Sequence, residues 1–136
     1  MPGRKFDPFI GRPMDLNRLL DQIKSHPDYA KVGMILCHKG VVRGTTREGR
    51  PVTGMRITVD HQRLAEILAE QKQKPGIVEI LVEINEGLDL GLGQDVMHIV
   101  VAGDIREHVI AGLAETLNRI KAEVTGKTQF FVTGNE

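Results

Sequence analysis

The 136-residue sequence is poor in cysteine, in aromatic residues and in long apolar runs. Its single cysteine, Cys37, excludes an intrachain disulfide and fits a reducing compartment. Four Phe, one Tyr and no Trp leave few side chains on which nucleic-acid bases could stack. No run approaches the roughly 20 apolar residues of a membrane helix, and the basic N-terminus lacks the apolar stretch of a secretory signal. These absences predict a soluble, cytoplasmic protein that binds neither membrane nor nucleic acid.

Net charge is also absent, because 18 basic residues balance 18 acidic ones. General attraction to polyanions is therefore not expected, and any anion site must come from a local cluster of cations. The length predicts one domain over residues 1–136. Residues 1–13 contain three of the six prolines and are predicted to be an irregular leader.

Several patterns that could indicate chemistry have simpler structural explanations. Cys37 lies in an apolar strand, where a thiol usually behaves as a small buried hydrophobe. Glu79 and Glu83 alternate with apolar residues, which is typical of the solvated face of a strand. The glycine-rich segment 87–93 is followed by a strand and not by a helix N-terminus, so we expect a wide connection and no nucleotide site. The five histidines do not show the paired spacing of metal ligands, so we expect no metal and no cofactor. The histidines are His26, His38, His61, His98 and His108.

The spacing of apolar residues predicts three helices and five strands. The predicted helices are a short one capped by Asp15, a second capped by Asp60, and a long one over 106–124. The predicted strands are 32–42 with a bend at Gly40, 52–59, 77–84, 96–102 and a short edge strand over 129–132. The order α-β-β-α-β-β-α-β indicates an α+β protein with a mainly antiparallel or mixed sheet and a long C-terminal helix.

Basic residues carry the strongest functional signal. Arg43 ends the first strand, Arg106 opens the long helix, and Lys121 borders the apolar stripe near the end of that helix. A lysine in such a position can be partly desolvated and so serve as an acid, a base or an amine nucleophile, while arginines suit a phosphate. The alternative is a lysine that only benefits from the helix dipole and extends into solvent. Spacing alone favours that alternative.

Several motifs that follow one another in a familiar order favour the functional interpretation of these basic residues. Gly40, Val42 and Arg43 match a strand in which a phenylalanine, a glycine and a Val-Arg pair lead into a polar loop. The loop and return strand over 48–55, and the long helix from Arg106 to its Ile-Lys ending, follow in the same order. Together these segments resemble the large subunit of molybdopterin synthase from about residue 15 to 131, as in a diverged member of that family.

The resemblance implies an α/β hammerhead fold and a homodimer that binds a small ubiquitin-like sulfur-carrier subunit, giving a heterotetramer. It implies transfer of sulfur from the C-terminal thiocarboxylate of that subunit to cyclic pyranopterin monophosphate, which yields molybdopterin without a metal. Lys121 would then be catalytic, as an acid-base group or by transient covalent capture. Arg43 and Arg106 would bind the substrate phosphate or the incoming tail. The further anion ligands would be Lys127, Lys39 and Arg50.

Departures from the family pattern keep two other hypotheses open. The family has a His-Arg pair before the long helix, and this chain has Ile105-Arg106, which keeps only the arginine. The position of the family's second lysine is occupied by Thr128, and the nearest lysine, Lys127, lies one residue earlier. Since fold and site are separable, the chain could be a non-catalytic module of this fold that binds the small subunit or a pterin. It could also be a structural α+β protein whose basic residues are merely solvated. Clustering of Arg43, Arg106 and Lys121 in one pocket would exclude that last hypothesis.

Overall fold

The computed structural model describes residues 14–133, so the predicted leader over 1–13 lies outside the described residues. The chain forms two three-stranded sheets, ordered β1-β5-β3 and β4-β2-β6, and every strand pair within them is antiparallel. The larger sheet consists of β1 (Met34–Val41), β5 (Asp95–Gly103) and β3 (Ile77–Ile84). The smaller consists of β4 (Leu90–Gly91), β2 (Val52–Val59) and β6 (Thr125–Phe131).

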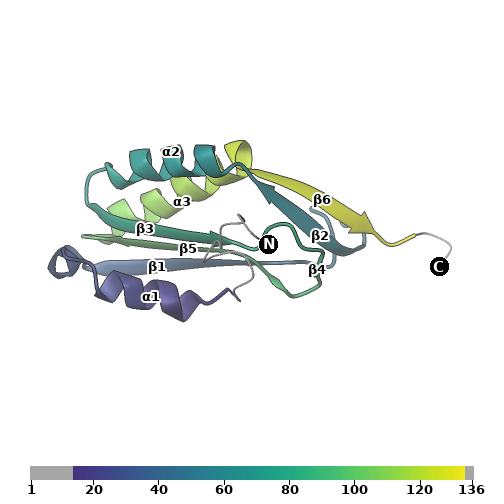
Figure 1. Ribbon diagram of the computed structural model, residues 1–136, viewed down its shortest axis with the longest axis horizontal. Helices are drawn as coiled ribbons and strands as arrows, with labels where there is room; N and C mark the ends of the chain where they lie inside the picture. The colour runs from purple at the N-terminus through teal and green to yellow at the C-terminus, as the bar shows by residue number, and fades with distance from the viewer. Residues whose placement is uncertain (1–13, 134–136) are drawn as a thin grey trace, which may run out of the picture.

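Three helices cover the two faces of the larger sheet (Figure 1). Helices α2 (His61–Lys72) and α3 (Arg106–Glu123) lie on one face, and α1 (Leu16–Lys24) lies on the other. A single-turn 3-10 helix, η1 (Tyr29–Lys31), connects α1 to β1. As predicted, Asp15 caps α1 by accepting a hydrogen bond from the Asn17 amide, and Asp60 caps α2 by accepting one from the Arg63 amide.

The central strand β5 separates two apolar clusters because its side chains alternate between the faces of the sheet. Met97, Ile99 and Val101 point toward α2 and α3, where they pack with Ile67, Ile80, Val109, Ile120 and Val124. Val100 and Ala102 point toward α1, where they pack with Leu19 and Ile23. The sheet is therefore buried on both sides along its middle strand.

The smaller sheet extends from one end of the larger one (Figure 1). Strand β2 is its centre and pairs with β6 from Val59 opposite Thr125 to Val52 opposite Phe131. The other edge, β4, approaches β2 closely because Gly54 has no side chain; a Cβ there would overlap the carbonyl oxygen of Leu90.

The structure confirms the α+β class, the bounds of β2 and β3, and the irregularity at Gly40, where the register of β1 against β5 shifts. Two predictions about strands were wrong. The last strand begins at Thr125, immediately after α3, because full pairing with β2 stabilises a segment whose own sequence is polar. The connection over 87–93 contains a short strand, β4, in place of a simple loop.

Two predictions about burial were also wrong. Glu83 is 7% exposed, because α1 covers the face of β3 that was expected to meet solvent. Cys37 is exposed, because β1 is an edge strand. Its residual contact with protein still raises the pKa of the Cys37 thiol by desolvation. None of the helices within residues 14–133 is long and apolar enough to cross a membrane.

Candidate functional site

A cavity of about 250 Å³ lies where the two sheets and the end of α3 meet. Its walls come from β1, β2, β5, α3 and β6, so it depends on the whole fold. Most of the lining is apolar, and the polar groups are two lysines, one histidine and one threonine. The lining residues are His38, Gly40, Val41, Met55, Ile57, Val96, Met97, Lys121, Thr125 and Lys127.

The two lysines reach the cavity through the abrupt change from α3 to β6. Lys121 lies in the last turn of α3, and β6 begins at Thr125, after a single residue that caps the helix. In β6, Lys127 pairs with Ile57, and both line the cavity. The next residue, Thr128, pairs with Arg56 and points to the opposite face of the sheet. Residue 127, and not 128, is therefore the position of β6 that faces Lys121.

His38 adds an imidazole to the same cavity from β1. It pairs with Ile99 and so lies on the face of the larger sheet that α3 covers. The pKa of His38 is lowered, first by partial burial and then by the positive charges of Lys121 and His98. Sequence analysis missed His38; the available signal was its alternation with Leu36, which places a histidine on the apolar face of the strand.

Among the residues that the structure describes, no carboxylate lines the cavity. Within residues 14–133, neither Lys121 nor Lys127 forms an ion pair, whereas Lys31, Lys39 and Lys72 each pair with a carboxylate. Lys121 is an exposed residue, so the partial desolvation expected for it is not present. Two uncompensated ammonium groups beside an apolar wall form a site that favours an anion with an apolar body.

The remaining predicted ligands lie outside this cavity. The Arg43 Nε donates a hydrogen bond to the carbonyl oxygen of Thr45 at 3.0 Å, within its own loop. The guanidinium carbon of Arg50 stands 3.7 Å from the centroid of the Phe131 ring, a cation–π contact. Lys39 points to the α1 side of the larger sheet, where its Nζ lies 3.3 Å from an Asp95 carboxylate oxygen.

Arg106 lies at the N-terminal end of α3, and its Nε is 3.2 Å from Glu107. At about 1.5 Å of rise per residue, the 15 positions between Arg106 and Lys121 separate them by roughly 22 Å. Within a single chain, the cavity that Lys121 lines therefore includes neither Arg43 nor Arg106, and the clustering that would exclude a merely structural role is not seen. The convergence that the structure shows is that of Lys121, Lys127 and His38.

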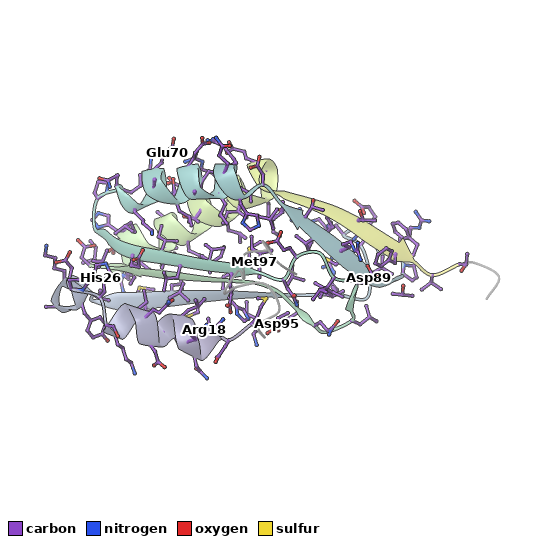
Figure 2. All side chains as sticks on the ribbon, viewed as in Figure 1. Arg18, His26, Glu70, Asp89, Asp95 and Met97 are labelled. Atoms are coloured by element: carbon purple, nitrogen blue, oxygen red, sulfur yellow. The ribbon has the colours of Figure 1, made fainter. Side chains whose placement is uncertain are left out.

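A second cluster of titratable groups lies on the other face of the larger sheet and is internally compensated. His98 is 1% exposed; its Nδ1 lies 2.7 Å from Glu83 and its Nε2 lies 3.2 Å from Asp95. Glu83 also accepts a hydrogen bond from Arg18 Nη2 at 2.8 Å and one from the Asp15 amide at 2.8 Å. Figure 2 shows Arg18 and Asp95 on the α1 side of the sheet and Met97 on the opposite side. Because each charge has a partner, this cluster fastens α1 to the sheet.

Within residues 14–133, no group of three or more His, Cys, Asp or Glu residues is arranged to hold a metal ion. The Glu83 cluster is held together by its own cation, Arg18. The polar side chains that line the cavity offer two amines, one imidazole and one hydroxyl group.

The fold is similar to that of several solved proteins. A molybdopterin synthase structure from Staphylococcus aureus aligns over 90% of this chain and 89% of its own at 19% identity, with a TM-score of 0.73. Molybdopterin cofactor biosynthesis protein E from Burkholderia multivorans aligns over 91% and 90% at 18% identity, with a TM-score of 0.69. The complex of subunits 1 and 2 of molybdopterin-converting factor from Helicobacter pylori aligns over 90% and 87% at 16% identity, with a TM-score of 0.64.

The sequence itself carries a family match. No match was found among curated proteins. A family model described as MoaE protein matches residues 10–123, which is well over half of the chain. The chain therefore belongs to the MoaE family of molybdopterin synthase large subunits, and with it to molybdenum cofactor biosynthesis, as the sequence resemblance predicted.

Proposed function

We propose that this chain is the catalytic subunit of a cytoplasmic molybdopterin synthase, which transfers sulfur from a small-subunit thiocarboxylate to cyclic pyranopterin monophosphate. The observation that carries the proposal is the cavity with two lysines that, within residues 14–133, have neither an ion-pair partner nor a carboxylate beside them in the lining. Both reactants are anions, and the pterin also presents a flat, largely uncharged body. Val96, Met97 and Ile57 supply an apolar wall for such a body, and the lysines supply its counter-charge.

Lys121 is the proposed catalytic residue. Lys121 is exposed and lines the cavity, so it is proposed to meet both the incoming C-terminal tail and the bound substrate. Fixed donors aimed at developing negative charge lower the barrier to acyl and sulfur transfer, because they need no reorganisation during the reaction. A neutral amine at the same position could also capture the tail carbonyl transiently, as the family resemblance implies.

Lys127 is proposed to replace the family's second lysine. Counting along the sequence places that lysine at Thr128, but Thr128 points away from the cavity and Lys127 points toward it. The side chains of a strand alternate, so a one-residue change in position is sufficient to decide which side chain reaches a ligand. We expect Lys127 to hold the substrate phosphate while Lys121 acts at the reacting sulfur.

The partners proposed for the chain are a small ubiquitin-like subunit and a second copy of itself. The Helicobacter pylori complex contains subunits 1 and 2 of that organism's converting factor, which supports a two-subunit assembly. Arg106 lies roughly 22 Å from Lys121 along α3, so it could serve a cavity only in a partner chain of the homodimer. The roles of Arg43, Lys39 and Arg50 as ligands of an anion stay predictions.

Reconstitution tests this proposal. The chain is mixed with a thiocarboxylated small subunit and cyclic pyranopterin monophosphate, and molybdopterin is measured. We expect product from the parent chain and a loss of roughly 100- to 10,000-fold in Lys121→Ala, the range for a positioned acid-base group. Lys24→Ala, which removes an exposed lysine of α1, is the matched control and should retain full turnover. A parent chain that makes no product would reject the catalytic proposal.

The second candidate is a non-catalytic binding module. The observation that favours it is the absence of Arg43 and Arg106 from the cavity. Such a module would bind the pterin substrate with an affinity that depends on Lys121 and Lys127, yet would give no product in the same reconstitution.

A further inference from the structure

His38 is the one cavity-lining residue whose ordinary pKa lies near neutral pH. Its ring is half-buried and turns along the strand toward Gly40; a Cβ built on Gly40 would lie 3.4 Å from His38 Nε2. A Cβ at residue 40 would therefore only reach van der Waals contact with the ring, which places the imidazole beside Gly40 on the cavity wall.

Within residues 14–133, the charged side chains that share the cavity with His38 are both basic: Lys121 from α3 and Lys127 from β6. From β5 it is influenced by His98, which lies on the opposite face of the sheet between Glu83 and Asp95. Strand β2 contributes only Met55 and Ile57 to the lining, and the neighbouring Lys39 points away.

An empty cavity therefore disfavours a third positive charge: the pKa of His38 is lowered first by partial burial and then by nearby positive charge. An anion held between Lys121 and Lys127 reverses this balance. It offsets the charge of the lysines and places an acceptor next to the ring, and both changes favour the imidazolium form. A dianion changes the balance more than a monoanion does, because its charge exceeds what a single ammonium group offsets.

We propose that His38 is an anion-binding residue that takes up a proton when the cavity is occupied, so that a bound dianion meets three cations. This assigns His38 a preference for doubly charged groups, such as a phosphate monoester, over singly charged ones, such as a carboxylate or a cyclic phosphodiester. The inference rests on the proposed function only in taking this cavity as the anion site. The inference predicts a pH dependence of dianion affinity. The affinity should increase as the pH falls through the range between the higher His38 pKa of the occupied site and the lower His38 pKa of the empty site.

An NMR titration of the full chain tests the inference with sulfate, which remains a dianion over the relevant pH range. The pKa of His38 is followed through its ring protons, assigned by their loss in His38→Gln, with and without sulfate at constant ionic strength. We expect saturating sulfate to raise the pKa of His38 by roughly one unit or more. His108, at the other end of α3, is the internal control and should not move beyond the chloride reference.

A second variant separates the charge effect from a folding defect. Lys121→Met should raise the pKa of His38 without any anion, because the repulsion from the ammonium group is gone. It should also reduce the further rise that sulfate produces. Sulfate that shifts the Met55 and Lys127 resonances but leaves the pKa of His38 unchanged would overturn this inference while leaving the anion site intact. Sulfate that shifts no cavity resonance would overturn both, whatever the outcome of the reconstitution assay.

Discussion

The two faces of the larger sheet differ in whether their charged side chains form ion pairs. On the α1 face, His98 lies between Glu83 and Asp95, and Arg18 completes the cluster. On the α3 face, His38 shares a cavity with Lys121 and Lys127, and none of the described residues that line it carries a carboxylate. The two histidines lie on adjacent strands and on opposite faces of the sheet, and they differ both in burial and in the charge of their neighbours. Burial with partners indicates a structural role, whereas unpaired charge at a cavity indicates a ligand.

The largest effect is expected when the shared carboxylate of the charged cluster on the α1 face is removed. Glu83→Ala leaves buried His98 and the Arg18 guanidinium without their shared carboxylate. Breaking a buried ion pair from one side costs about 3–5 kcal/mol, and we expect that loss in the free energy of unfolding measured with urea. Glu79→Ala, on the same face of β3 but partly exposed, is the control and should cost about 1 kcal/mol or less. Equal losses of unfolding free energy in the two variants would contradict the structural role assigned to the Glu83 cluster.

The next effect separates two neighbouring residues of β6. Lys127→Ala should weaken binding of the pterin substrate by roughly 10- to 100-fold, since a hydrogen bond to a charged group contributes about 1.5–3 kcal/mol. Thr128→Ala, one residue later and on the outer face, should leave binding within about twofold. Isothermal titration calorimetry measures both. A greater loss in Thr128→Ala would show that the strand alternation assigned here is not the functional one.

A smaller effect sharpens the contrast within β1. Lys39 points to the α1 face and pairs with Asp95, so Lys39→Ala should reduce the free energy of unfolding by about 1 kcal/mol or less. Substrate affinity in the cavity should be unchanged, because the side chain lies on the other side of the sheet. A tenfold loss of affinity would show that Lys39 reaches the substrate, as the sequence analysis predicted.

The smallest effect concerns the pH dependence of stability. The pKa of His38 is lower in the folded chain than its ordinary value, so the unfolded chain binds this proton first. The parent should lose stability as the pH falls through the ordinary histidine pKa toward the lowered folded value. His38→Gln lacks this contribution, and its unfolding free energy should decrease less between about pH 7 and pH 5. Parallel curves for the two proteins would contradict the repulsion inferred in the cavity.

Local sequence signals predicted most of the fold. Asp15 and Asp60 cap their helices as expected, and the alternation in 52–59 and 77–84 gave the bounds of β2 and β3. The failures share a cause, because each depends on a contact between distant segments. Strand β6 forms at Thr125 because β2 pairs with it, and Glu83 is buried because α1 brings Arg18 to it.

The candidate site was predicted in part for the same reason. Lys121 drew attention by its place beside the apolar stripe of the long helix, but its catalytic role and the role of Lys127 came from the family resemblance. Their common cavity, and the exclusion of Arg43 and Arg106 from it, depend on how α3 turns into β6 and how β1 lies beside β5. His38 required the register of β1, which fixes the face to which each side chain points and cannot be read from residue types alone.

The central claim is that the uncompensated cations of the cavity bind the substrate anion. The most direct measurement is calorimetric titration of cyclic pyranopterin monophosphate into the parent chain and into the double variant Lys121→Met, Lys127→Met. We expect the parent to bind and the double variant to lose roughly 100-fold or more in affinity, since two charge-assisted contacts are removed at once. A double variant that is folded and binds as tightly as the parent would contradict the account.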